Sequence, residues 1–230
     1  MSNSIWISDY DVIHRCNTET FQLSIAAFPN RMNAKFHSLP RNWQVVQWEL
    51  AGIGTRDDFY VRGDDLVERY TVDDLSTEIY NRVLPGRDGV EMILSRQTSL
   101  LDSDPGLSLK FYFEDANSIS TMNADGDWNP PGLGPTDRAD LINPMAAVVG
   151  CLDAVQYGLF VYPGDCEAMQ VQRTSEEAVE VTLPLFTVHL EKGVIRRSRV
   201  RFVRAEGKDA MQQLADKYRA FCESEVPLTT

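Results

Sequence analysis

The chain has 230 residues, 43% of them hydrophobic, and carries a formal charge of −12 from 22 basic and 34 acidic residues. This hydrophobic fraction argues against a disordered chain, and the length suits one large β or α/β domain. The sequence contains neither a run of roughly 20 apolar residues nor the basic and apolar start of a secretory signal, so we expect a soluble, cytoplasmic protein with no membrane partner. Its four cysteines are widely spaced, which favours reduced thiols over disulfides or a zinc site.

Alternation of apolar and polar residues with period two dominates the first half of the chain. This pattern predicts strands with one buried face, separated by turns. The runs that show it are residues 20–28, 43–50, 57–71, 77–84, 90–97 and 107–113. The runs at 77–84 and 90–97 are joined by a Pro- and Gly-containing segment, residues 85–89, which predicts a second hairpin. About a dozen strands are expected in total.

The run at 57–71 predicts a hairpin with a defined register. Gly63 at the first loop position suits a type II′ turn. With that turn, Arg62 lies opposite Asp65 and Asp58 lies opposite Arg69. Opposite charges on neighbouring strands stabilise a sheet, so the charge pattern supports the same register.

The rest of the chain contains one clear helix and two less regular segments. An apolar stripe with a 3.6-residue period predicts a helix over about 208–223. Residues 146–156 are apolar throughout, so they fit either a helix that begins at Pro144 or a buried strand. Residues 114–143 are rich in Gly, Pro, Asn and Asp, which predicts a long loop.

These elements predict a mainly β fold. We expect a single domain over residues 1–230, built as a large antiparallel β-sandwich with the long loop near its middle and the helix at its C-terminus. A strongly curved supersandwich-like architecture, which many sugar-binding and sugar-active proteins use, would accommodate this number of strands. Such an analogy of fold says little about function.

Positive charge is concentrated in one segment. Residues 192–204 hold six cations and no anion, a local charge of +6 that leaves −18 on the other 217 residues. If residues 191–193 form a three-residue hairpin loop, residues 181–190 pair with residues 194–203. The face of the second strand that carries Val200 is then predicted to point into the core.

The opposite face of that strand would display an arginine row, Arg197, Arg199 and Arg201, with His189 at its edge. Each guanidinium presents donors in a fixed fork that matches carboxylates and phosphates, so the row predicts a site for an anionic or carbohydrate-like ligand. Trp128, in the long loop, would act as a lid over that ligand. The alternative is structural, with carboxylates of neighbouring strands neutralising the row.

A second candidate site is a calcium loop. Asp125, Asp127 and Asn129 have the i, i+2, i+4 spacing of oxygen ligands at the start of such a loop. The pattern then departs from an EF-hand, because Pro130 stands where glycine is needed and Thr136 where a bidentate Glu belongs. Two interpretations are left, a different calcium loop or an ordinary Asp-Gly turn. The sequence indicates no other cofactor.

Three functions fit these features. The first is a non-catalytic module that binds an anionic or carbohydrate-like ligand on the arginine row. The second is a carbohydrate-active enzyme in which His189, Glu191 or the Asp102/Asp104 pair supplies acid and base. The third is a scaffold that forms a homo-oligomer when the arginine row meets an acidic patch of a second copy. Nucleic acid is not expected, because the net charge is negative and no aromatic residues interleave with the arginines.

Overall fold

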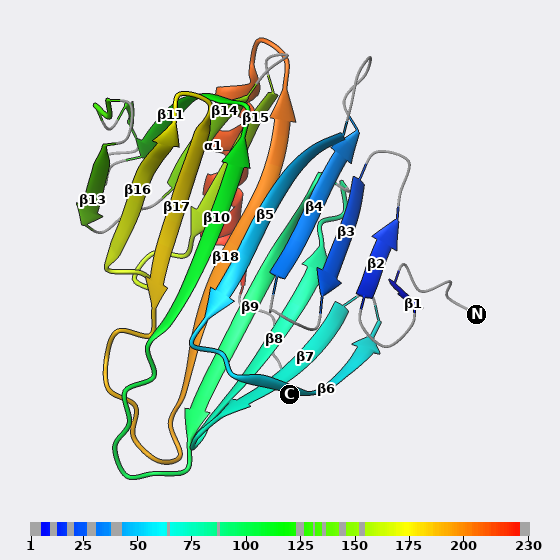
Figure 1. Ribbon diagram of the computed structural model, residues 1–230, viewed down its shortest axis with the longest axis vertical. Coiled ribbons are helices and arrows are strands. Elements are labelled where there is room, and N and C mark those ends of the chain that lie inside the picture. The colour runs from blue at the N-terminus through cyan, green and yellow to red at the C-terminus, as the bar shows by residue number, and fades with distance from the viewer. Residues whose placement is uncertain are drawn as a thin grey trace.

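Two antiparallel nine-stranded sheets pack face to face in the computed structural model (Figure 1). The structure describes residues 6–9, 13–17, 21–26, 31–37, 43–63, 65–86, 88–122, 127–130, 132–134, 137–142, 146–151 and 155–225. Side chains are described from Val46 onward, apart from that of Cys151. This architecture confirms the predicted mainly β sandwich.

The first sheet combines the N-terminal strands with strands from the second half of the chain. Its order is β1-β2-β3-β4-β5-β10-β17-β16-β13. The bounds are β1 (Trp6–Asp9), β2 (Ile13–Asn17), β3 (Phe21–Ala26), β4 (Arg31–His37), β5 (Trp43–Ala51), β10 (Leu107–Glu114), β13 (Arg138–Ile142), β16 (Ala168–Ser175) and β17 (Ala178–Leu185). As the alternation predicts, Val46, Trp48 and Leu50 of β5 are buried.

The second sheet lies behind the first in Figure 1 and has the order β12-β11-β14-β15-β18-β9-β8-β7-β6. The bounds are β6 (Thr55–Arg62), β7 (Asp65–Val72), β8 (Leu75–Val83), β9 (Gly89–Thr98), β11 (Ala116–Met122), β12 (Trp128–Asn129), β14 (Ala146–Cys151), β15 (Val155–Val161) and β18 (Ile195–Glu206). An aromatic cluster fills the space between the sheets. It contains Trp48, Phe111, Phe113, Tyr157 and Phe202.

The predicted hairpin at 57–71 has the expected register. In the β6–β7 pair, Arg62 lies opposite Asp65 and Asp58 lies opposite Arg69. Gly63 has φ +62°, a conformation that suits glycine at this turn. The next hairpin, β8–β9, is also confirmed. Charge pairing and turn chemistry therefore define these neighbouring strands correctly.

Helix α1 (Ala210–Glu223) confirms the predicted C-terminal helix. Its buried residues include Leu214, Tyr218 and Phe221, which pack in a second apolar cluster with Phe160 of β15 and Val203 of β18. The helix therefore covers part of the outer face of the second sheet. No helix among the described residues is long and apolar enough to cross a membrane.

The structure contains strands in both of the less regular segments. Of the two alternatives for residues 146–156, the strand is correct, since β14 and β15 occupy the segment. The segment 114–143 is not one continuous loop, because it contains β11, β12 and β13. Strand β12 has only two residues, and such a short strand carries no recognisable alternation.

The predicted hairpin of residues 181–190 with residues 194–203 is wrong. Strand β17 pairs with β10 and β16 of the first sheet, whereas β18 pairs with β9 and β15 of the second. The expected turn does form, because Val194 N–H donates to the Glu191 carbonyl at 3.0 Å and Gly193 has φ +83°. This turn lies within the connection that crosses from β17 of the first sheet to β18 of the second. The same local turn can therefore occur in a crossover connection as well as in a hairpin.

Candidate functional site

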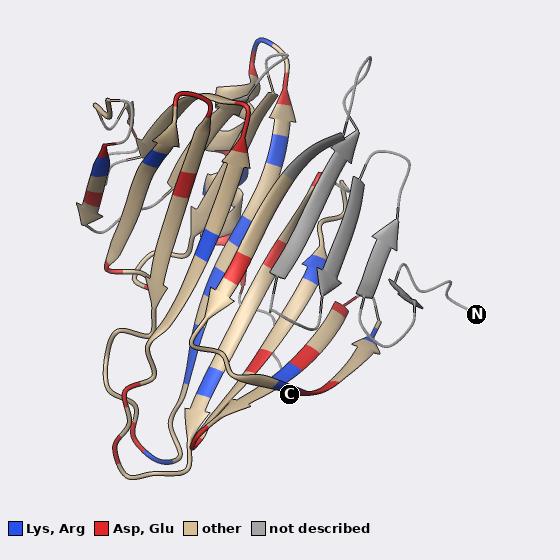
Figure 2. Ribbon diagram, in the orientation of Figure 1, with Lys and Arg blue, Asp and Glu red and all other residues tan. Residues whose placement is uncertain are grey.

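The structure divides the arginine row into a buried part and an exposed part. As predicted, Val200 points into the core and the arginines lie on the opposite face of β18. Arg199 is only 2% exposed, whereas Arg197 is exposed. Figure 2 shows the basic residues along β18 and the mixed charges on the neighbouring strands.

The buried part of the row is paired with a carboxylate of the same chain. Arg199 donates from Nε and Nη2 to Glu91 Oε1 at 3.1 and 2.7 Å. Arg201 Nη2 lies 3.3 Å from Glu91 Oε2. Arg199 also donates to the carbonyl and the hydroxyl of Ser224 at 3.2 and 2.9 Å, which attaches β18 to the end of α1. Both guanidiniums therefore make structural contacts within the chain.

Burial perturbs the titration of groups around this pair. Desolvation lowers the pKa of Arg201, although Glu91 acts in the opposite direction. Desolvation also raises the pKa of Asp165 to about 6, while the backbone N–H of Arg199, which donates to its carboxylate at 2.7 Å, acts to lower it. Both groups lie beside the buried Arg199, where an unpartnered charge is costly.

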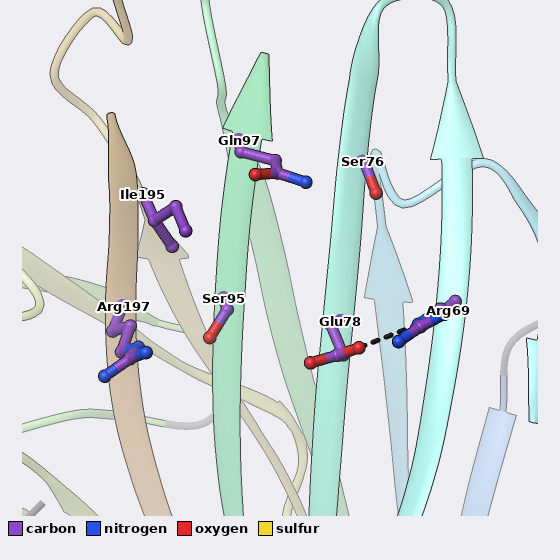
Figure 3. A pocket seen from close by; sticks show the side chains of 7 residues that line it. All are labelled: Arg69, Ser76, Glu78, Ser95, Gln97, Ile195 and Arg197. Atoms are coloured by element: carbon purple, nitrogen blue, oxygen red, sulfur yellow. Dashed lines mark hydrogen bonds and ion pairs between the residues drawn. The ribbon is translucent and has the colours of Figure 1, made fainter. Parts of the chain in front are cut away.

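Arg197, the exposed member of the row, lines a hollow on the outer face of β7, β8, β9 and β18 (Figure 3). The side chains that line this hollow are Arg69, Ser76, Glu78, Ser95, Gln97, Ile195 and Arg197. Its volume of ≈ 390 Å³ lies within the range of about 300–1,000 Å³ typical of small-molecule sites. We call it the polar hollow.

Strand register aligns the charged groups of the polar hollow in one row across the sheet. Arg69 lies opposite Glu78, Glu78 opposite Ser95, and Ser95 opposite Arg197. Arg69 Nε donates to Glu78 at 2.8 Å, and this hydrogen bond is the largest contribution to the raised pKa of Arg69. The hollow thus brings one carboxylate together with two guanidiniums, two hydroxyls and an amide.

Two further groups bear on what the polar hollow can bind. The Tyr80 hydroxyl donates to Glu78 Oε1 at 2.7 Å, and desolvation, together with this carboxylate, raises the pKa of Tyr80 to about 12. The Ser95 Oγ is buried and has no hydrogen-bond partner among the described residues. A buried hydroxyl without a partner costs free energy, and a ligand hydroxyl in the hollow would satisfy it.

The acid–base candidates of the sequence lie on loops outside the polar hollow. His189 Nδ1 lies 3.2 Å from Asp102 Oδ1, so two of them do come together. Both side chains are mostly exposed, and neither lines the hollow. Asp104 accepts a hydrogen bond from the Gly106 N–H at 3.1 Å, as a turn residue does, and Glu191 is exposed in the crossover turn.

Trp128 does not cover the polar hollow. It belongs to β12, at the opposite end of the sheet from the strands that form the hollow, and packs against the cluster beneath α1. Of the calcium candidates, Asp127 and Asn129 are exposed and Asp125 lies outside the described residues. No group of three His, Cys, Asp or Glu residues in the described ranges is arranged to hold a metal ion. Calcium binding therefore stays a prediction.

Sequence analysis did not find Arg69, Glu78, Ser95 and Gln97 as site residues. The hairpins that carry them were predicted, and their outward-facing positions follow from the alternation. The missing information was that β18 lies next to β9. Only that long-range pairing places Arg197 beside Ser95 and Glu78.

The two curved sheets and the C-terminal helix place this chain among the aldose epimerase β-sandwich folds. An aldose epimerase homologue from C. elegans superposes with a TM-score of 0.59 over 84% of this chain and 98% of its own, at 7% sequence identity. For a galactose mutarotase-related enzyme from Lactobacillus acidophilus the TM-score is 0.55 over 86% and 99%, at 6% identity.

A longer protein shares the same architecture. The α-N-acetylgalactosaminidase of Bifidobacterium bifidum matches with a TM-score of 0.56 over 90% of this chain but only 38% of its own length, at 11% identity. No protein-family model and no curated protein matches the sequence. At these identities the structural likeness establishes the fold.

Proposed function

We propose that this chain is a carbohydrate-active enzyme that binds a sugar in the polar hollow. The observation that carries the proposal is the row in which Glu78 lies between Arg69 and Ser95, with Arg197 at its end. Carboxylate, guanidinium, hydroxyl and amide groups are the partners that sugar hydroxyls need. The similarity of the fold to aldose epimerases and to a glycosidase favours this enzyme over the non-catalytic module that the arginine row alone suggests.

The reaction that suits a single carboxylate in an open hollow is the interconversion of sugar anomers. The Glu78 carboxylate takes the proton of the C1 hydroxyl, and the bond between C1 and the ring oxygen breaks as that oxygen receives a proton from water. After rotation about the bond between C1 and C2, the hydroxyl formed from the ring oxygen adds to the other face of the aldehyde and gives its proton to the hydroxide, while the C1 oxygen recovers its proton from Glu78. Arg69 orients the carboxylate, while Arg197 and Ser95 donate hydrogen bonds to sugar oxygens.

Replacement of Glu78 tests this assignment. The variant E78Q keeps the shape of the side chain but removes the base, so we expect the catalysed rate to fall by about 10²- to 10⁴-fold. The rate is measured by NMR as pure α anomers of D-glucose, D-galactose and D-glucuronate equilibrate, the last because Arg197 suits an anion.

The matched control for that experiment is E180Q. Glu180 also lies on the outer face of a sheet, with a side-chain exposure of 20% against 24% for Glu78, and forms an ion pair with Lys110 at 3.7 Å. E180Q should keep the wild-type rate. An unchanged rate in E78Q, or an equal loss in both variants, would contradict the role of Glu78.

The non-catalytic module remains the second candidate, because the unpartnered Ser95 hydroxyl and Arg197 serve binding as well as catalysis. Calorimetric titration of the same sugars separates the two functions. Binding of a sugar without acceleration of its anomer interconversion would favour the module.

A further inference from the structure

Exposed apolar side chains gather on two loops. Of the seven large apolar side chains exposed in the described ranges, five lie in residues 99–106 and at or near residues 186–194. They are Leu100, Leu101, Val188, Val194 and Ile195. We call them the apolar rim. Single exposed apolar residues need no explanation, but a group of this kind marks a binding surface.

The two loops that carry the apolar rim are held to each other. Ser103 N–H donates to the Leu190 carbonyl at 3.0 Å, and Leu190 N–H donates to the Ser103 carbonyl at 2.9 Å. The Ser103 hydroxyl also donates to Asp74 at 2.6 Å, and Leu190 is fully buried. These contacts position both loops in the absence of a ligand.

The apolar rim continues from one end of the polar hollow. Ile195 belongs to both, since it is 56% exposed and lines the hollow. Strand β9 ends one residue after Gln97, another lining residue, and leads directly into Leu100 and Leu101. Figure 3 shows Ile195 and Gln97 together at this end of the hollow.

We infer that the polar hollow also binds amphiphilic glycosides, whose sugar occupies the polar hollow and whose apolar aglycone lies on the apolar rim. The inference rests on the sugar binding of the proposed function and adds a class of ligand, because a glycoside has no C1 hydroxyl and is not itself converted. A polar site that continues into an apolar surface fits a molecule that has a polar part and an apolar part. An anionic lipid surface is a poorer match for the rim, because Asp102, Asp104 and Glu191 lie on the same loops and would repel it.

The test compares two glycosides that differ only in the length of the aglycone. Methyl β-D-glucopyranoside and octyl β-D-glucopyranoside, the latter below its micellar concentration, are titrated into the protein in a calorimeter. Burial of only two additional methylene groups would make the octyl glycoside bind about tenfold more tightly. We expect at least that ratio.

Two variants decide whether the apolar rim is responsible. L101S should remove most of the octyl preference and leave the affinity for the methyl glycoside unchanged. The control I142S changes an equally exposed residue, since Leu101 and Ile142 are both 83% exposed, but Ile142 lies on β13 of the other sheet. I142S should bind both glycosides like the wild type.

The outcomes separate this inference from the proposed function. Equal affinity of the wild type for both glycosides, or an equal loss of the octyl preference in L101S and I142S, would overturn the inference and leave sugar binding intact. A loss of affinity for the methyl glycoside in L101S would also overturn it, because the loop would then only support the hollow. Binding of neither glycoside would overturn the inference, and a wild type that also binds no D-glucose would overturn the proposed function.

Discussion

Glu91 is the residue that determines the state of the arginine row. Its carboxylate contacts the guanidiniums of both Arg199 and Arg201, and its side chain is only 4% exposed. Phe221 of α1 lies over both guanidiniums, with Cζ-to-centroid distances of 4.8 and 4.7 Å. In the third hypothesis of the sequence, an acidic patch of a second copy would therefore face only one exposed arginine of the row, Arg197.

The variant E91Q should be strongly destabilised. Glutamine keeps the size of the side chain but removes the ion-pair partner of the buried Arg199 and the partly buried Arg201, and loss of a buried ion pair costs about 3–5 kcal/mol. Urea denaturation gives the free energy of unfolding. The control is E206Q, because Glu206 is 63% exposed and pairs with Arg204 at 2.8 Å. In this variant the free energy of unfolding should fall by less than about 1 kcal/mol. Similar decreases in the free energy of unfolding of both variants would show that burial does not determine how much these ion pairs contribute to stability.

At this scale the sequence predicted which face of β18 carries the arginines but not what lies opposite them. The period of two is a local property, and it separates Val200 from Arg199 and Arg201 without any knowledge of the neighbouring strand. The partner Glu91 lies 108 residues before Arg199 and could not be inferred from a pattern. For this reason the sequence left two interpretations open, in which the arginine row is either neutralised by carboxylates of the same chain or binds a ligand.

At the scale of elements, β9 connects the predicted and the unpredicted parts of the second sheet. It pairs with β8 in a short hairpin and with β18 across the chain. Gly89 at its start lies against β18, where a Cβ atom would stand 2.1 Å from the carbonyl oxygen of Phe202 and 2.9 Å from the Cα of Val203. The contact is with backbone, which cannot move without separating the strands.

The variant G89A should therefore be destabilised by about 2 kcal/mol, the cost of forcing a methyl group into a packed site. In G86A the new methyl group would meet only the side chain of Asp88, at 3.1 Å, and a small shift of that side chain would disturb at most its partly exposed ion pair with Lys217. This control should stay within about 0.5 kcal/mol of the wild type. Thermal unfolding of the two variants provides the comparison, and equal stability would contradict the close approach of β9 and β18.

Sequence patterns defined the elements joined by short turns and failed for those joined by a crossover. Gly63 and the charges around it are sufficient to define β6–β7, because both strands of the hairpin are present in the same short segment. The turn at Gly193 has the same chemistry but connects the two sheets. Phe186, with φ +56°, directs the chain out of β17, and no preference of phenylalanine predicts that conformation.

At the scale of the molecule, both sheets interleave strands from distant parts of the chain. In the first sheet β10 lies between β5 and β17, and in the second β18 lies between β9 and β15. No single cut in the sequence separates all strands of one sheet from all strands of the other. The β-sandwich was predictable because alternation and turn spacing are typical of it, but this order of strands was not.

We expect the chain to unfold in one cooperative transition, as the prediction of a single domain requires. Trp48 is buried in the aromatic cluster between the sheets, with ring centroids 5.7 Å from Phe111 and 5.8 Å from Phe202. In a variant with Trp6, Trp43 and Trp128 replaced by Phe, tryptophan fluorescence comes from Trp48 alone and reports the packing of the sheets, and far-UV circular dichroism reports the strands. The two signals should give the same midpoint in urea. Separate midpoints would indicate units that unfold independently.

The charged hairpin at the end of the second sheet has a consequence for association between copies. Strand β6 is the last strand in the described order, so one side of its backbone has no neighbouring strand there. An exposed strand edge is a template for β-aggregation. Four of the eight residues of β6 are charged, and its register shifts between Arg56 and Asp58. The same charges that define the hairpin thus hinder fibril-like addition of a second β6.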